Sequence, residues 1–142
     1  MLHTPARERL FCPVYCLMPD HIHLVWMELD AETDQLNGMS FLRTYLKPLL
    51  HPQELQHQAF DHVLEEAERG DDAFETACAY VLENPLRAGL VKRVEDWPHT
   101  GCILPGYPTL HPLQPEYWSK LWKLFRSKRT QPTRWEGGPI EL

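Results

Sequence analysis

The triplet His21-Ile22-His23 is the first place in the sequence where side chains could carry out chemistry. In an extended strand, residues two apart point to the same face, about 6.6–7 Å from each other, so the two imidazoles could bind one cation. Ile22 between them would enter the core. A lone triplet of this kind also fits two polar residues on a solvated strand face. It therefore predicts a metal site only in combination with other ligands.

Tyr80 and Asn84, four residues apart, form a second candidate pair. If one helix carries both, their side chains lie on one stripe of its surface. A phenol can act as a nucleophile, and an amide oxygen is a hard ligand for a divalent cation. A helical tyrosine is also a common core or rim residue, so both interpretations stay open at this level.

Asp61 and His62 form a third candidate, because an acid beside a base suggests a proton relay. In a strand, however, adjacent side chains point to opposite faces of the sheet. The relay therefore stays a hypothesis, with two unrelated surface residues as the alternative.

Two apolar segments would position the histidines. Residues 10–18 (LFCPVYCLM) and 21–29 (HIHLVWMEL) are rich in apolar and aromatic residues and are separated by a Pro-Asp pair. This pattern predicts an antiparallel hairpin. A short strand is also expected at 101–104, whereas residues 55–64 are ambiguous between strand and helix.

The tyrosine would lie on the clearest helix of the chain. This helix begins after residue 70 in an acidic turn, where the helix dipole favours negative charge, and continues with apolar residues at helical spacing over 74–82. It should end near Asn84-Pro85, because the residue before a proline disfavours helical dihedrals. Two further helices are expected, 41–50 after a Ser40 cap and 117–125.

The length and composition indicate one folded domain without a membrane span. The chain has 142 residues, of which 43% are hydrophobic and 24% charged, values typical of globular proteins. No apolar run approaches the roughly 20 residues that cross a bilayer, and the first residues lack the apolar core of a signal peptide. We therefore expect a cytoplasmic protein.

Charge is unevenly distributed along the chain. The net charge is −6, yet residues 119–135 contain six basic residues and no acidic one. The first 118 residues, with 8 basic and 18 acidic side chains, carry −10. An acidic body repels phosphate backbones, whereas the basic segment favours them. We expect residues 1–126 to form the domain and 127–142 a mobile basic tail.

The four cysteines form no C-x-x-C pair, which removes the common zinc and redox motifs. In a strand, Cys12 and Cys16 would stand about 13 Å apart, too far to share one zinc ion. We expect buried free thiols in a reducing compartment. They are Cys12, Cys16, Cys78 and Cys102.

The histidine and tyrosine segments together resemble one family. The sequence YCLMPDHIHLV at 15–25, followed by YVLENPLRAGLV at 80–91, is similar to the REP-associated tyrosine transposases. These are single-strand DNA nucleases with a His-hydrophobe-His metal motif. FDHVLEE at 60–66 resembles the corresponding segment of one branch, and the resemblance spans about residues 10–118.

The resemblance implies an α+β fold of the ferredoxin-like type, an antiparallel sheet with helices on one face. It makes His21, His23 and Asn84 ligands of Mg²⁺ or Mn²⁺, and Tyr80 the nucleophile. The implied reaction is cleavage and rejoining of single-stranded DNA at hairpin-forming repeats through a 5′-phosphotyrosine, with a 3′-hydroxyl as the leaving group. The protein would act on single-stranded or hairpin DNA as a monomer or homodimer.

Basic residues after the Tyr-Asn motif and in the basic segment would contact the DNA backbone in this interpretation. Solvated surface charge is the alternative for each of them. They are Arg87, Lys92, Arg93, Lys120, Lys123, Arg126, Lys128 and Arg129.

Two features depart from the family pattern. Asp20 stands where the family usually has asparagine, which adds a negative charge beside the histidines. Only about ten residues precede the first strand, where the family has a further strand and a helix. We therefore expect an exposed edge on the strand of His21 and His23. The alternative function is a catalytically inactive remnant that binds DNA or another protein.

Overall fold

A five-stranded antiparallel sheet forms the centre of the molecule, with the strand order β3-β5-β2-β1-β4. The computed structural model describes residues 9–29, 33–56, 60–61, 71–128 and 139–141. The strands are β1 (Leu10–Leu17), β2 (Ile22–Glu28), β3 (Phe60–Asp61), β4 (Thr100–Ile103) and β5 (Pro139–Glu141). The helical elements are α2 (Gln35–Leu50), α3 (Asp71–Arg87), α4 (Tyr117–Lys128) and the 3₁₀ turn η2 (Val94–Asp96).

The hairpin of β1 and β2 confirms the sequence prediction at this point. Pro19 and Asp20 form its tip, and the backbone N–H of Met18 donates to the carbonyl of His21 at 2.9 Å. The tip is also attached to the loop that leads into β4, because the indole of Trp97 donates to the carbonyl of Leu17 at 3.0 Å. The turn before the histidines is therefore held from two sides.

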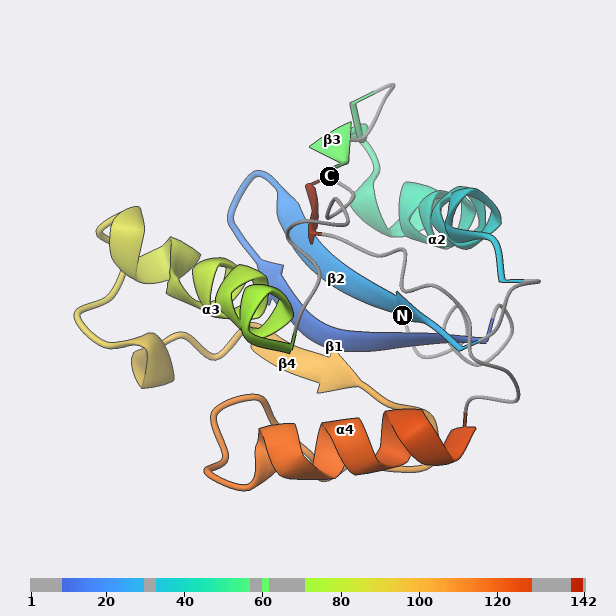
Figure 1. Cartoon of the computed structure of the whole chain (residues 1–142). Coiled ribbons are helices and arrows are strands. Elements are labelled where there is room, and N and C mark those ends of the chain that lie inside the picture. The colour runs from blue at the N-terminus through green and yellow to red at the C-terminus, as the bar shows by residue number, and fades with distance from the viewer. Residues whose placement is uncertain (1–8, 30–32, 57–59, 62–70, 129–138, 142) are drawn as a thin grey trace.

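Helices cover both faces of the sheet (Figure 1). The α+β prediction of an antiparallel sheet with packed helices is confirmed, although the helices were expected on one face. One face packs against α3 and α4 through a cluster that includes Val14, Val25, Cys78, Val81 and Leu121. The other face packs against α2 through Leu10, Cys12, Leu24, Trp26, Leu42 and Ile103.

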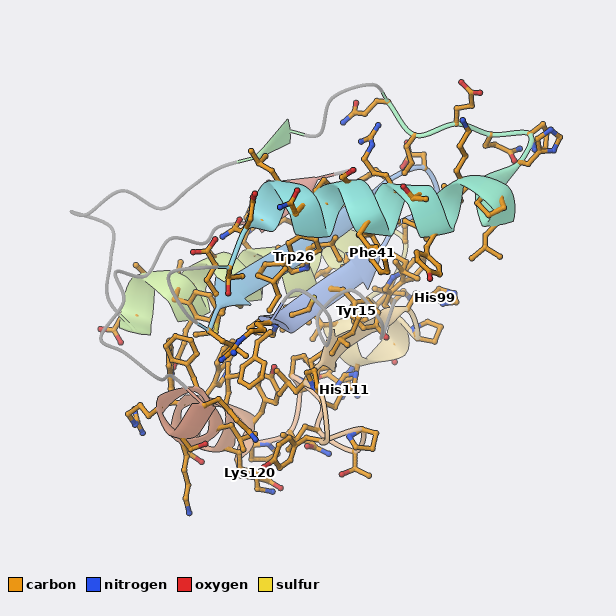
Figure 2. All side chains as sticks on the ribbon, turned by 90° about the vertical axis from the view of Figure 1, so that its right-hand side faces the viewer. Tyr15, Trp26, Phe41, His99, His111 and Lys120 are labelled. Atoms are coloured by element: carbon orange, nitrogen blue, oxygen red, sulfur yellow. The ribbon has the colours of Figure 1, made fainter. Side chains whose placement is uncertain are left out.

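Helix α2 begins earlier than the sequence suggested. The Asp34 side chain caps it by accepting from the backbone N–H groups of Leu36 at 2.8 Å and Asn37 at 3.3 Å, the arrangement of an N-cap acid. Gly38 in its first turn lies over the sheet, where a Cβ would come within 2.9 Å of the Trp26 ring. Figure 2 shows Trp26 beneath this helix.

Helix α3 extends slightly beyond the end that the sequence predicted near Asn84-Pro85, because it continues through the proline to Arg87. Proline lacks the N–H that would bond to the carbonyl four residues earlier, which belongs to Val81. The side chain of Asn84 replaces that donor, because its Nδ2 donates to the Val81 carbonyl at 3.3 Å. A local side-chain bond therefore offsets the effect of the proline and lets the helix continue.

Helix α4 contains the first part of the basic segment, and its inner side belongs to the core. Tyr117, Leu121 and Phe125 are buried, and the Tyr117 hydroxyl donates to the carbonyl of Pro13. Of the expected tail at 127–142, residues 129–138 and 142 lie outside the described part of the chain, and 139–141 form β5.

The strand that follows His21 has a neighbour on each side, which corrects the expectation of an exposed edge. β5 pairs with its outer edge, with His23 opposite Glu141 and Val25 opposite Pro139. The outer edge of β2 is thus covered by β5.

The cysteines agree with the prediction of free thiols. Cys12, Cys16 and Cys78 are buried, and Cys102 is half-buried. Among the helices of the described ranges, none is long and apolar enough to cross a membrane.

Candidate metal and nucleophile site

His23 lies on the face of the sheet that α3 covers. In the ladder between β1 and β2 it pairs with Cys16, and cross-strand partners point to the same face. Cys16 belongs to the buried cluster that contains Cys78 and Val81 of α3. The His23 side chain is only 6% exposed, so it lies at the margin of this core, on the α3 side.

The two imidazoles converge, as their spacing on a strand allows. The Nε2 atoms of His21 and His23 are 2.9 Å apart. The rings meet edge to face, with centroids 4.6 Å apart and an interplanar angle of 83°. At this distance one Nε2 donates its proton to the other, so the pair shares a proton between two nitrogen atoms.

Asp20 contacts the other nitrogen of His21. Its Oδ1 lies 2.6 Å from His21 Nδ1, and the carboxylate can only accept, so the imidazole donates. The hydrogen bond from His21 and the charge of that imidazole hold the pKa of Asp20 below its ordinary value. Asp20, His21 and His23 therefore form one continuous chain of hydrogen bonds.

Tyr80 lies at the surface of α3 with 51% of its side chain exposed. The guanidinium carbon of Arg87 is 4.9 Å from the centre of the Tyr80 ring, within the range of a cation–π contact. Arg87 also donates to the Glu83 carboxylate at 2.8 Å. A cation next to the phenol could stabilise negative charge on its oxygen or on a phosphate bound beside it.

Asn84 follows Tyr80 by one helical turn and is partly buried. Its Nδ2 donates to the carbonyls of Tyr80 at 3.0 Å and Val81 at 3.3 Å. With the amide nitrogen engaged in this way, Oδ1 is the atom that could bind a cation. Asn84 therefore has a structural function in α3 beside any function as a ligand.

The tyrosine helix and the histidine turn lie at the same end of the sheet. In Figure 1 the second half of α3 and the turn between β1 and β2 are both on the left, and α3 packs against β1 and β2. Met18 in that turn packs against the cluster that contains Val81 and Leu82. The fold thus places the helix of Tyr80 and Asn84 on the sheet face toward which His23 points.

The spacing of the histidine pair matches that of two neighbouring ligands of a small divalent cation, which would take the place of the proton that the two nitrogen atoms share. Mg²⁺ binds its ligands at about 2.0–2.1 Å in octahedral geometry, which places neighbouring donor atoms about 2.9 Å apart. The two Nε2 atoms have this separation of 2.9 Å. Across the described ranges, no group of three His, Cys, Asp or Glu side chains could hold a metal ion. In the resemblance, the amide oxygen of Asn84 would be the third protein ligand.

The candidate DNA contacts lie on two elements. Arg87 and Arg93 form ion pairs with Glu83 and Glu95, at 2.8 and 3.4 Å, and Lys92 is exposed. On α4, Lys120 pairs with Glu116 at 3.1 Å and extends away from the body of the molecule in Figure 2. Arg129 lies outside the described residues. The exposed basic side chains that remain are Lys123, Arg126 and Lys128 of α4.

The structure describes only one residue of the proposed Asp61-His62 relay. Asp61 ends the short strand β3 and pairs with Ile140 of β5. His62 lies outside the described residues.

Sequence reasoning missed three contacts that shape this site. They are the bond between Asp20 and His21, the bond from Asn84 to the Val81 carbonyl, and the stacking of Arg87 on Tyr80. Two of them had a signal in the sequence, since an asparagine directly before a helical proline, and a cation seven residues after an aromatic residue, are both visible there.

Comparisons with known proteins add no family. The sequence matches no protein-family model, and searches of curated proteins and of solved structures find no similar chain.

Proposed function

We propose that this chain cleaves and rejoins single-stranded DNA in the manner of the REP-associated tyrosine transposases that its motifs resemble. The substrate would be a hairpin-forming repeat. The observation that carries the proposal is the convergence of His21 and His23 on the sheet face covered by the helix of Tyr80 and Asn84.

The nucleophile in this proposal is the phenol of Tyr80. A phenol has an ordinary pKa near 10 and attacks slowly at neutral pH, unless the developing charge is stabilised. Bound by His21, His23 and Asn84, Mg²⁺ or Mn²⁺ would supply Lewis-acid polarisation of the scissile phosphate. The exposure of Tyr80 gives a DNA strand access to the hydroxyl.

The covalent step balances without a further reactant. The Tyr80 oxygen forms a bond to phosphorus and loses its proton, while the bond from phosphorus to the 3′ oxygen breaks and that oxygen leaves as a 3′-hydroxyl. The 5′-phosphotyrosine keeps the energy of the broken phosphodiester. Rejoining is the reverse attack by a 3′-hydroxyl, so no nucleotide is hydrolysed.

A covalent-adduct assay on a denaturing gel tests the proposal. The full chain is incubated with Mn²⁺ and labelled hairpin oligonucleotides, because a phosphotyrosine link survives denaturation. The wild type should form an adduct and Tyr80→Phe should not. Tyr45→Phe is a matched control, since Tyr45 is 53% exposed and Tyr80 51%, and it should react like the wild type.

Two outcomes would contradict the proposed chemistry. An adduct that persists in Tyr80→Phe would remove Tyr80 as the nucleophile. Hairpin binding by the wild type with no adduct under any condition would instead support the alternative function, an inactive remnant that binds DNA.

A further inference from the structure

We propose that Asp20 is a positioning residue, which fixes the ring orientation and the tautomer of His21 so that its Nε2 lone pair faces the metal site. This inference rests on the proposed function, because only there do His21 and His23 bind a metal ion. It adds Asp20 to the residues of the candidate site, at a position where the resembling family usually has asparagine.

The geometry uses both nitrogen atoms of the His21 ring. Nδ1 lies 2.6 Å from the Asp20 carboxylate and Nε2 lies 2.9 Å from Nε2 of His23. A carboxylate accepts only, so Nδ1 carries a proton, and in the neutral ring Nε2 then keeps its lone pair. This is the form in which a histidine binds a metal through Nε2, with its other N–H donated to a carboxylate.

The backbone holds Asp20 in the place that this bond needs. Asp20 lies in the two-residue tip of the hairpin, which the bond from Met18 N–H to the His21 carbonyl closes at 2.9 Å. The strand end before the tip is fixed as well, since the N–H of Leu17 donates to the carbonyl of His99 at 2.9 Å. The carboxylate is therefore presented by a closed turn.

If Asp20 and His21 formed only a surface ion pair, removing that pair would have a different effect. The Asp20 side chain is 85% exposed, and exposed ion pairs contribute little to stability. If the contact were only that, its loss would leave the His21 tautomer and the metal affinity unchanged. If it positions the ring, both should change while the fold stays intact.

Two substitutions separate orientation from charge. Asp20→Asn removes the charge but keeps an oxygen that can accept from Nδ1, whereas Asp20→Ala removes the acceptor. Glu54→Ala is the control, because Glu54 is an exposed acid near the end of α2. The metal-free chains are examined by long-range ¹H–¹⁵N NMR of the imidazoles, with His21→Ala to assign the His21 signals, and Mn²⁺ binding is measured by calorimetry.

The wild type, Asp20→Asn and Glu54→Ala should show His21 protonated at Nδ1 and bind Mn²⁺ within about threefold of one another. Asp20→Ala should lose this tautomer and bind Mn²⁺ about 10–100-fold more weakly, as is typical when such an outer partner is removed. A wild-type tautomer in Asp20→Ala would overturn the inference. So would equal loss of tautomer and affinity in Asp20→Asn and Asp20→Ala, because charge would then be the cause. Failure of the wild type to bind Mn²⁺ would count against the proposed function instead, while the metal-free spectra still decide the role of Asp20.

Discussion

Asn84 offers a test in which a structural function and a function as a ligand can be measured separately. Pro85 leaves the Val81 carbonyl without its helical N–H donor, and Asn84 Nδ2 donates to that carbonyl at 3.3 Å. Asn84→Ala removes this donor and leaves a carbonyl next to the core unsatisfied. A net hydrogen bond contributes about 1 kcal/mol, which in a chain of this size corresponds to a fall of about 3 °C in the midpoint of thermal unfolding.

The double-mutant cycle with Pro85→Ala isolates this bond. Alanine in place of the proline restores the backbone N–H, so the Val81 carbonyl no longer needs the amide of Asn84. Pro85 is buried, and its replacement has its own cost, but that cost cancels in the coupling energy. We expect Asn84→Ala to lower the free energy of unfolding by about 1 kcal/mol when Pro85 is present and to have almost no effect in the Pro85→Ala background.

Thr76→Val is the matched control on the same helix. The Thr76 hydroxyl donates to the Asp72 carbonyl at 2.7 Å, but that carbonyl is in a part of the helix without proline and has a backbone donor. Removing the hydroxyl should therefore change stability by less than Asn84→Ala does. Chemical denaturation of the wild type, the three variants of the cycle and this control gives all the required free energies of unfolding.

The substitution Asn84→Asp separates the two functions. A carboxylate cannot donate to the Val81 carbonyl, so Asn84→Asp should be destabilised like Asn84→Ala, yet it keeps an oxygen that can bind Mn²⁺. A coupling energy with Pro85 below about 0.3 kcal/mol would refute the structural reasoning. Equal Mn²⁺ affinity in Asn84→Asp and Asn84→Ala would refute the function of Asn84 as a ligand.

Two further predictions concern the core that supports the site. Gly38→Ala should lower the free energy of unfolding by about 1 kcal/mol, because the new Cβ would come within 2.9 Å of the Trp26 ring. Ser40→Ala on the same helix is the control, and an unfolding midpoint in Gly38→Ala at or above that of the control would contradict the packing. Burial raises the pKa of Cys16 from 9.0 to about 11, so the folded chain keeps a thiol proton that the unfolded chain loses, and stability should fall as the pH rises from 9 to 11. Cys16→Ala should reduce this slope in melts across that range, and an unchanged slope would show that the thiol has no part in it.

The hairpin and the helix of Tyr80 could be predicted from the sequence because their signals are local. A Pro-Asp pair between two apolar runs gives the turn, and an acidic start before apolar residues at helical spacing gives α3. The end of α3 could not be predicted from the general rule for proline. The rule holds for the backbone of Pro85, but the neighbouring side chain of Asn84 supplies the missing donor.

The neighbour of the histidine strand could not be predicted because it is distant in the sequence. Nothing in residues 139–141 alone indicates that they pair with His23, Leu24 and Val25, since strand pairing over more than one hundred residues depends on the whole chain. Helix α4, in contrast, agrees with the helix expected at 117–125 and continues to Lys128. Its three buried residues, four apart from one another, form a narrow apolar stripe beside the basic residues.

The distribution of charge limits how this chain could recognise DNA under the proposed function. Arg87, Arg93 and Lys120 each lie within 3.4 Å of a carboxylate, so they add little net attraction for a phosphate backbone. The whole chain carries −6, and long-range steering of DNA would be unfavourable at low salt. Affinity would then depend on short-range contacts at the histidine end of the sheet, with the metal ion as the main positive charge there. A protein of this kind should bind hairpins with a shallow salt dependence and should lose most of its affinity when divalent ions are chelated.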